Sequence, residues 1–518
     1  MDDRGSELES SAPSAHDARA RELGVSNEAL AAADAIELEP RNGAASDALR
    51  VMQWNILADG LANDGFLVRD VLDPASEAVS VEETLSKMDE ARGGDMSQLK
   101  RQLGTVRAAK NLTAVVDWTR RWEKIKEVIE AAQPDVIALQ ELDHFADAAR
   151  DLKALGYECA MPNGQYEPVH AAGLAKGDVA AYVSHLERRA VAFAPNVSST
   201  CRKQALKEHP YSPADDDGSA IFWRTSSMEC ESITFLPFGE ASRVHGVVRV
   251  TLRRRSDERS FNVMSAHLKS GDKPEHEAER IHELDSRLSE TRPSVLGWFE
   301  ESAENEPTIF CLDANSSPKR TEERTVWKVL RSVVGVSSVW DFAYDPDGTA
   351  LGSPLPVSTN KMRGPLSSQP AKIGGHAYQL IDHVFYSEPL TLKRHVCAPL
   401  HHENGKADAR SQLLPSLGIP SDHMPVIVDF DLPPKGGAAS AAASADDSKE
   451  ASRTERTRIA RPWIIALLLA ALVAWAIQYG SGANTIFDVM LSSQPQLDRV
   501  QTSGASRTPR TKRMPSRR

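Results

Sequence analysis

Two short stretches, Gln379-Leu380-Ile381-Asp382-His383 and Ser421-Asp422-His423-Met424-Pro425, decide how we interpret the rest of the chain. In each, an Asp-His pair precedes an apolar run that predicts a buried strand: Val384-Phe385-Tyr386 in the first and Val426-Ile427-Val428 in the second. An aspartate can hold a histidine ring in one tautomer and stabilise its cation. Polar residues at strand ends form a site where several such ends converge.

Four upstream stretches have the same form, an apolar run predicted as a strand and ending in polar side chains. They are residues 49–55, 136–141, 261–267 and 308–315. Further strands are predicted at 220–223, 233–235 and 247–250. Helices are predicted within 81–133, where Trp118, Trp122 and Ile125 recur at helical spacing, and at 275–300. Residues 346–376, rich in Pro, Gly and Ser, are predicted as a loop.

The polar residues at these strand ends are carboxylates, amides and imidazoles without a cysteine partner. They are Asn55, Glu141, His267, Asp313, Asn315, Asp382, Asp422 and His423. Oxygen ligands of this kind suit Mg²⁺ or Mn²⁺ better than structural zinc. Phosphate hydrolysis needs a metal, a base that orients water, and donors to the nonbridging oxygens. The set therefore predicts a metal-dependent phosphoester hydrolase.

Composition limits the partners and the compartment. Of the 518 residues, 61 are Lys or Arg and 73 are Asp or Glu, so the net charge of −12 does not make the whole chain a trap for nucleic acid. A phosphate-bearing substrate must be held by a local groove and by metal. The five cysteines form no CxxC pair, which is typical of reduced thiols in a cytosolic compartment.

The chain is predicted to have five parts. Residues 1–48 are acidic, nearly lack aromatic side chains and are predicted to be mostly disordered. Residues 49–432 form the catalytic domain, and the Pro-, Gly-, Ala- and Ser-rich stretch 433–461 is a flexible linker. Residues 462–479 are predicted as a transmembrane helix, and 480–518 as a polar tail that ends basic.

The membrane prediction depends on one apolar run. Trp463 to Tyr479 is apolar except for Gln478, at the lower limit of length for a spanning helix. Four arginines precede it: Arg453, Arg456, Arg458 and Arg461. Positive residues close to a span favour the cytosol, so we expect a single C-terminal anchor with the catalytic domain on the cytosolic side. A short span with a basic tail fits the endoplasmic reticulum or the outer mitochondrial membrane.

The motifs, in this order, resemble the endonuclease/exonuclease/phosphatase superfamily, also called DNase I-like, over about residues 49–432. They are Met52-Gln53-Trp54-Asn55, Leu139-Gln140-Glu141-Leu142-Asp143-His144, Ser265-Ala266-His267-Leu268-Lys269, Leu312-Asp313-Ala314-Asn315, Leu380-Ile381-Asp382 and Pro420-Ser421-Asp422-His423. Gln53-Trp54-Asn55-Ile56-Leu57-Ala58, Trp118 to Arg121 and Asp217 to Phe222 resemble the nocturnin and carbon-catabolite-repressor-type deadenylase branch. The resemblance implies a four-layer α/β sandwich of two mostly antiparallel sheets flanked by helices, with the site where strand ends converge.

The resemblance also implies roles for the metal-side residues. Glu141 would carry Mg²⁺ (or Mn²⁺), with Asn55 assisting at the metal or a phosphate, and Asp422 would reach a second metal.

For the catalytic residues, the resemblance implies that Asp313 orients and deprotonates the attacking water while Asn315 holds a phosphate oxygen. His423 would donate to the scissile phosphate, Asp382 would orient His423, and His267 would be a further phosphate donor. Asn315-Ser316-Ser317 also matches a glycosylation acceptor, and a glycan there would block the site, which again favours the cytosol.

Several functions share this site. The first is a Mg²⁺-dependent 3′-exoribonuclease of the deadenylase type, acting on RNA with a 3′ poly(A) tail. The second is a nucleotide or dinucleotide phosphatase; Ser270-Gly271 stands where nocturnin-like sequences carry an arginine, which weakens the dinucleotide reading. The third is a membrane-associated phospholipid phosphodiesterase of the neutral sphingomyelinase type. A tethered RNA-binding scaffold with an inert site is disfavoured by the intact Glu141, Asp313 and His423, and without a leucine-rich repeat, docking on a deadenylase scaffold complex is not expected.

Overall fold

The computed structural model describes residues 14–41, 47–62, 66–67, 114–162, 168–170, 218–238, 245–285, 294–297, 299, 306–363, 374–409 and 412–432. The chain divides into two units, residues 1–435 and 436–518, and all the described residues belong to the first. Among the described helices, none is both long and apolar enough to cross a membrane. The expected linker, the expected span at 462–479 and the basic tail lie outside the described residues.

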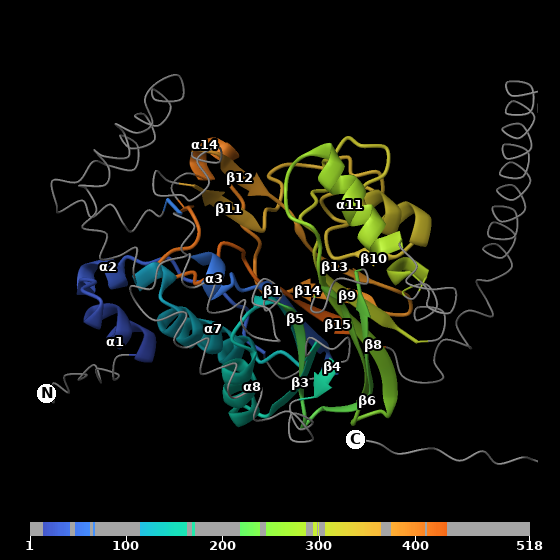
Figure 1. The fold of residues 1–518 in the computed structure, drawn as a ribbon, viewed down its shortest axis with the longest axis horizontal. Coiled ribbons are helices and arrows are strands. Elements are labelled where there is room, and N and C mark those ends of the chain that lie inside the picture. The colour runs from blue at the N-terminus through green and yellow to red at the C-terminus, as the bar shows by residue number, and fades with distance from the viewer. Residues whose placement is uncertain are drawn as a thin grey trace, which may run out of the picture. The chain divides into compact units, whose positions relative to one another are not determined.

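Two mixed β-sheets form the centre of the first unit (Figure 1). In spatial order, the first sheet contains β14 (Thr391–His395), β15 (Val426–Asp431), β1 (Leu49–Asn55), β2 (Val136–Leu142), β5 (Gly218–Arg224), β3 (Tyr157–Pro162) and β4 (Pro168–His170). The second contains β10 (Ser337–Ser338), β13 (Asp382–Tyr386), β9 (Thr308–Asp313), β8 (Arg259–His267), β7 (Gly246–Arg254) and β6 (Met228–Pro237). The pairs β1–β2 and β8–β9 are parallel, and the other neighbouring strands are antiparallel.

Helices lie against both sheets, as expected from the sequence (Figure 1). The first sheet packs against α7 (Trp118–Ala132) and α8 (Phe145–Ala154). The second shares its core with α11 (Pro274–Asp285), α13 (Val326–Lys328) and the π-helical turn η5 (Val329–Val334). The remaining elements are α1 (Ala15–Glu22), α2 (Asn27–Ala31), α3 (Asp59–Ala62), α14 (Lys406–Ala409) and a hairpin of β11 (Thr359–Met362) and β12 (His376–Gln379).

The alternation of side chains along β1 explains how the layers form. Leu49 and Val51 point into the core between the sheets, whereas Met52 and Trp54 pack with the apolar side chains of α7. The helix begins at the cap Asp117, whose side chain accepts from the Arg120 amide, and ends at Gln133 in the left-handed region. Each fully buried aliphatic side chain stabilises this packing by about 1.5–3 kcal/mol. Gln53, on the inward face of β1, is polar and points toward the functional site.

The N-terminal segment differs from the expectation of disorder, because residues 14–41 are ordered against the catalytic domain. Nδ1 of His16 in α1 lies 2.6 Å from a carboxylate oxygen of Glu127, and Arg19 forms two hydrogen bonds with Asp117. Ala20 is fully buried. Most apolar residues of this segment are alanines and none is aromatic, so its order comes from docking onto the catalytic domain, which composition alone does not reveal.

The loop expected at 346–376 also contains structure. Its residues Thr359–Met362 form β11, which pairs with β12. The strand is short and polar, so the sequence shows no apolar alternation that would have indicated it. It brings Lys361 to the functional site.

Candidate active site

The functional side chains come from strand ends at one edge of the two sheets. On the second sheet, Asp313 is the register partner of His267 on one side and of Asp382 on the other. On the first sheet, Asn55 ends β1 and is paired with Gln140 of the parallel strand β2. Because parallel strands end at the same edge, β1–β2 and β8–β9 place their polar termini together. This is the convergence that the sequence predicted.

Glu141 reaches the site through an irregularity in β2. The register with β5 shifts between Leu139 and Leu142, and Glu141 has a φ of 55°. In a regular strand it would point to the face opposite Gln140; the bulge turns its carboxylate toward Asn55 instead. A left-handed conformation in a non-glycine residue is strained and is commonly found at functional sites. Leu57 and Asn315, on two neighbouring segments, also have positive φ values of 58° and 48°.

Asn55 joins the two carboxylates across the gap between the sheets. Its amide nitrogen donates to Oε1 of Glu141 at 2.9 Å and to Oδ2 of Asp313 at 2.8 Å. Its oxygen accepts from the Leu57 amide at 3.0 Å, which fixes the orientation of the side chain. The other Glu141 oxygen accepts from the Ala58 amide at 3.1 Å.

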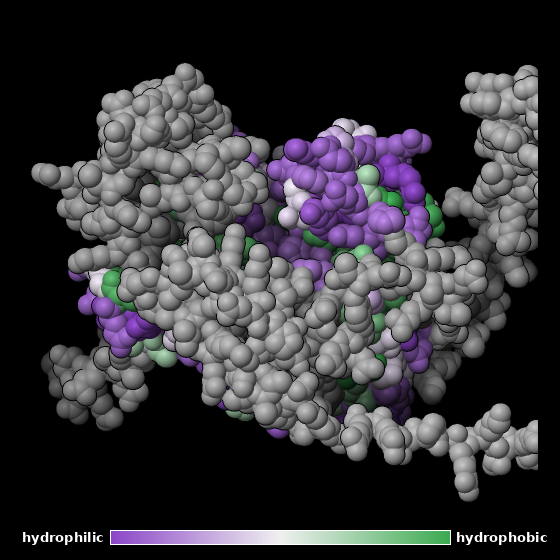
Figure 2. All heavy atoms as spheres, in the orientation of Figure 1, coloured by the Kyte–Doolittle hydropathy of each residue, from purple (hydrophilic) through white to green (hydrophobic). Residues whose placement is uncertain are grey.

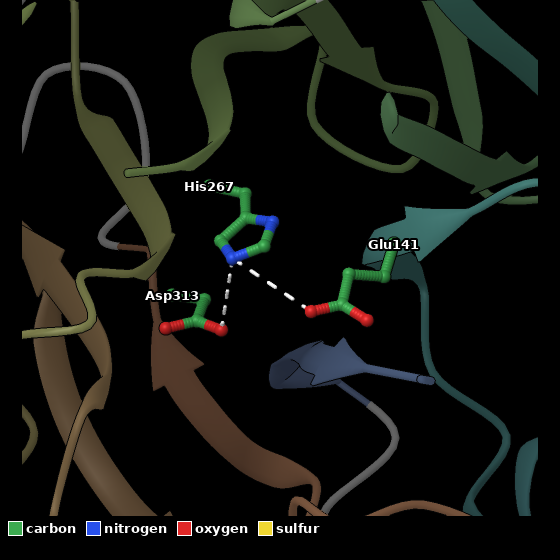
Figure 3. Close-up of side chains that lie close together, drawn as sticks. All are labelled: Glu141, His267 and Asp313. Atoms are coloured by element: carbon green, nitrogen blue, oxygen red, sulfur yellow. Dashed lines mark ion pairs between the residues drawn. The ribbon is translucent and has the colours of Figure 1, made fainter. Parts of the chain in front are cut away.

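His267 lies between the same two carboxylates (Figure 3). Its Nε2 is 3.8 Å from Oε1 of Glu141 and 3.5 Å from Oδ2 of Asp313. The side-chain nitrogen of Asn315 lies 2.9 Å from the same Nε2 and also donates to the Leu268 carbonyl at 3.0 Å. Glu141, His267 and Asp313 therefore form one compact group, and Asn315 lies at its border.

On the other side of Asp313 lies a buried Asp-His pair. Nδ1 of His423 is 2.8 Å from Oδ2 of Asp382 and 3.9 Å from Oδ2 of Asp313. Ser358 donates to Oδ2 of Asp382 at 2.6 Å, and Gln53 donates to Oδ1 at 3.0 Å. With Nδ1 bound to Asp382, the Nε2 edge of His423 faces Nζ of Lys361 at 3.3 Å. Asp382 is thus in contact with the ring, and its role in orienting His423 stays a prediction.

The pKa values of the two buried aspartates, Asp313 and Asp382, shift in opposite directions. Burial, followed by the charge of Asp382, raises the pKa of Asp313 above its usual value. Burial also opposes ionisation of Asp382, but the charge of His423 and the hydrogen bonds to the carboxylate outweigh it and lower its pKa. For His423, burial disfavours the cation, yet the attraction of Asp382 prevails and raises the pKa to about 9. At neutral pH, His423 is thus a cation facing a carboxylate suited to accept a proton.

The donor set fits a divalent cation. One ligand atom each from Glu141, His267 and Asp313 lie within 4.8 Å of one another, as do those of Asp313, Asp382 and His423. The second group is already paired internally by the His423–Asp382 hydrogen bond. In the first, two carboxylates converge with only neutral Asn55 and a histidine between them, so a hard cation would relieve their repulsion. Glu141 is the residue best placed to hold it, with Asn55 and Asp313 next to it.

Asp422 has a different neighbour from the one expected. Its carboxylate forms an ion pair with Lys361 of β11 and is nearly fully buried. Burial opposes ionisation, but the lysine charge lowers the pKa of Asp422 far below its usual range. The ion pair gives this carboxylate a cation from within the chain, and its role at a second metal stays a prediction. Nζ of Lys361 also lies 3.3 Å from Nε2 of His423, a contact that no sequence motif indicated.

Two further features support the site from behind. Gln53 also donates to Gln140 at 2.8 Å, and Gln140 donates to Ser265 at 3.0 Å, so buried amides connect the sheets beneath Asp382. This network was not predicted from the sequence, although the polar residues Gln53 and Asn55, at alternate positions at the end of β1, were its signal. His383, in contrast, faces Ser316, with Nε2 3.0 Å from the carbonyl, and burial lowers its pKa to about 4. It belongs to the packing rather than to the site.

Comparison with known families identifies the chain. A model of the endonuclease/exonuclease/phosphatase family matches residues 52–423, which include every candidate site residue from Asn55 to His423. The chain belongs to this family. Its members are phosphoesterases, so the expectation of an enzyme of this class is confirmed.

Sequence relatives within the endonuclease/exonuclease/phosphatase family include nocturnins. Nocturnin from Drosophila melanogaster is 24% identical over 398 residues, 75% of this chain but 47% of the relative, so the match spans about half of that protein. Nocturnin from Mus musculus is 24% identical over 405 residues, 77% of this chain and 68% of the relative. The resemblance to the nocturnin branch is thereby confirmed.

Solved structures of the family are also similar to this chain. The human nocturnin catalytic domain with bound sulfate is 19% identical, with a TM-score of 0.41, and the match covers 78% of this chain and 98% of that one. The structure of ANGEL2, a 2′,3′-cyclic phosphatase, is 17% identical, with a TM-score of 0.41, covering 74% of this chain and 95% of that one.

Proposed function

We propose that the chain is a Mg²⁺-dependent phosphoester hydrolase that removes nucleotides from the 3′ end of polyadenylated RNA. The observation that carries the chemistry is the position of Asp313. One of its oxygens, Oδ2, lies 3.5 Å from Nε2 of His267 and 3.9 Å from Nδ1 of His423. A single buried carboxylate thus stands between a metal-binding group and a cationic donor.

Each residue has a distinct task in this reaction. Asp313, with its raised pKa, accepts a proton from the attacking water as the new P–O bond forms. His423 donates a hydrogen bond from Nε2 to a nonbridging oxygen, whose charge increases as the water oxygen adds to phosphorus. The bond to the 3′ oxygen of the shortened RNA then breaks, and this oxygen takes up a proton from solvent. Asn315 and His267 hold another oxygen of the phosphate, and Glu141 and Asn55 hold the cation. Bound Mg²⁺ would neutralise phosphate charge.

The RNA substrate is supported by the surroundings of His423 and by the nocturnin and deadenylase motifs. Lys361, which pairs with Asp422, lies beside His423, and the guanidinium carbon of Arg363 lies 3.9 Å from the centroid of the Phe66 ring. Two cationic side chains thus lie close to Asp422 and can attract an anionic chain. Tyr378 and His402, with ring centroids 5.4 Å apart, lie on and near the same hairpin and offer aromatic surfaces. Base stacking on such rings tolerates any base and supports binding of single strands.

Attachment to a membrane is the second part of the proposal. Residues 462–479 would form a single C-terminal span, with the catalytic domain in the cytosol at the endoplasmic reticulum or the outer mitochondrial membrane. The apolar run and the four arginines before it support this topology.

A substrate panel tests the catalytic proposal. Full-length protein is incubated in Mg²⁺ or Mn²⁺ with RNA bearing a 3′ poly(A) tail, with NADPH and with sphingomyelin. The expected result is stepwise shortening of the RNA from its 3′ end with release of AMP, abolished by chelator. Efficient release of only a dephosphorylated dinucleotide, or of only phosphocholine, would replace the deadenylase proposal with the corresponding alternative.

A further inference from the structure

Arg121, in the first turn of α7, is fully buried and binds two loops at once. Its Nη1 donates to the carbonyl of Ile56 at 2.9 Å and to that of Leu57 at 2.8 Å. The same nitrogen lies 3.4 Å from the Pro420 carbonyl. The first two carbonyls follow β1, whereas Pro420 comes just before the Ser421-Asp422-His423 stretch. One guanidinium therefore connects two segments that are about 360 residues apart in sequence.

The first of these loops carries the metal side of the site. It begins at Asn55, and its Leu57 and Ala58 amides bind Asn55 and Glu141. Leu57 has a φ of 58°, a strained conformation that surrounding contacts must maintain. The carbonyl of Leu57 is one of the two that Arg121 holds most closely.

The second loop carries His423, the proposed hydrogen-bond donor to the phosphate. Ser421 donates to the Asn55 carbonyl at 2.6 Å and accepts from the His423 amide at 3.1 Å. The indole of Trp54 donates to the His423 carbonyl at 2.9 Å. The distance between the Asn55 and His423 sides thus depends on a small set of contacts, and Arg121 lies where the two loops meet.

The charge of Arg121 is as important as its geometry. The carboxylates of Asp59, Asp143, Asp422 and Glu141 attract it, and the indole of Trp118 lies 5.3 Å from the guanidinium carbon. Arginine keeps its charge when buried and offers several donors in a rigid plane. Lysine in the same place retains the charge, but its nitrogen is on a flexible stem and it lacks the Nε group, which in Arg121 donates to the Val116 carbonyl at 3.4 Å and orients the guanidinium plane.

We infer that Arg121 is a positioning residue that holds the Asn55–Ala58 loop and the Pro420–His423 loop at the spacing needed for metal binding and phosphate donation. The inference deepens the proposed function, because it assigns a residue to the same site. The hydrogen-bond partners of Arg121 Nη1 are backbone carbonyls, so its role is positioning rather than catalytic.

The test compares Arg121→Lys with Arg50→Lys in the full-length chain. Arg50 is a matched control: it is also fully buried, binds Asp429 at 2.7 Å and the Ala132 carbonyl at 2.7 Å, and lies at the opposite end of β1 from Asn55. Three measurements are made: amide hydrogen exchange, the Mg²⁺ dependence of thermal unfolding without substrate, and kcat and KM on the best substrate. The amides to follow are those of Leu57, Ala58 and His423.

In Arg121→Lys we expect at least tenfold faster exchange at these three amides than in Arg50→Lys. We also expect at least fivefold more Mg²⁺ for half of the thermal shift, and at least a tenfold lower kcat with KM within threefold. Equal exchange at the three amides and equal Mg²⁺ dependence in the two variants would overturn the inference. If Arg121→Lys does not fold, Trp118→Leu replaces it, because the Trp118 ring lies 5.3 Å from the guanidinium carbon. We then expect smaller changes in the same direction, and exchange and Mg²⁺ dependence equal to those of Arg50→Lys would again overturn the inference.

The outcomes separate this inference from the proposed function. A wild-type protein that hydrolyses none of the candidate substrates, while the exchange and Mg²⁺ measurements still distinguish Arg121→Lys from Arg50→Lys, contradicts the function but supports the positioning role. Normal wild-type hydrolysis with indistinguishable variants contradicts the positioning role alone.

Discussion

Nδ1 of His423 lies 2.8 Å from Oδ2 of Asp382, and both side chains are almost completely buried. This pair sets the charge of His423, which in the proposed reaction donates a hydrogen bond to the phosphate. Burial disfavours the histidine cation, so its pKa of about 9 depends on the neighbouring carboxylate. The charged donor is therefore present throughout the physiological pH range.

We predict that Asp382→Asn moves the alkaline limit of activity to lower pH. The pKa of His423 is raised above its unfolded value, so the charge-based stabilisation is complete below about pH 6.5 and is lost as pH rises through about 9. Without the carboxylate, the cation is lost earlier, and kcat at neutral pH should fall about 10²–10⁴-fold. The measurement is the pH profile of kcat/KM. Asp429→Asn, which also removes a buried carboxylate paired with a cation, should leave the profile in place; a shared shift would count against the Asp382–His423 assignment.

Glu141→Gln should raise the Mg²⁺ concentration needed for half-maximal activity by more than tenfold. The variant removes the charge of one of the two carboxylates that accept hydrogen bonds from Asn55, and Glu141 is the one at the border of the site. Titration of activity with Mg²⁺ measures the effect. Glu277→Gln is the control, because Glu277 is a buried carboxylate bound to Arg280 in α11 and should change stability without changing the Mg²⁺ requirement. Undiminished hydrolysis by wild-type protein in excess chelator would refute the metal claim altogether.

Asp313→Asn should make the metal-free protein more stable while slowing turnover about 10²–10⁴-fold. The raised pKa of Asp313 means that its folded state disfavours the charge, so stability is lost as pH rises from about 4 through the folded pKa. A neutral amide removes the repulsion with Asp382, and a gain of about 1 kcal/mol would raise Tm by roughly 2 °C. Thermal unfolding at pH 7 in chelator measures this. A lower Tm for the variant would show that the charged form of Asp313 is stabilised, contrary to the electrostatics described above.

Removing residues 1–41 should destabilise the catalytic domain, whereas removing residues 1–13 should not. The first deletion takes away the buried Ala20, the His16–Glu127 contact and the two Arg19–Asp117 hydrogen bonds at the cap of α7. Loss of such contacts costs about 1–3 kcal/mol. Chemical denaturation of the two truncated proteins and the full chain gives the comparison. Equal stability of all three would mean that α1 and α2 do not contribute to the fold.

The sequence predicted those parts of the site that depend on strand ends. Asn55, His267 and Asp313 end apolar runs and Asp382 precedes one, and the pairing of the strands brings these ends together. The features that the sequence did not predict depend on contacts between residues that are far apart in the chain. The turned carboxylate of Glu141 requires a bulge opposite β5, and Lys361 reaches the site on a polar strand with no apolar alternation. The N-terminal helices are likewise ordered by docking, which local composition cannot encode.

The central claim is tested most directly by single-turnover hydrolysis of 3′-polyadenylated RNA in Mg²⁺ by the wild-type protein, Asp313→Asn and His423→Ala. We predict that the wild-type protein releases AMP from the 3′ end and that chelator abolishes the reaction. Each variant should react about 10²–10⁴-fold more slowly with circular dichroism spectra unchanged. Near wild-type rates in both folded variants would contradict the account, because the Asp313–His423 arrangement would then not be the active site.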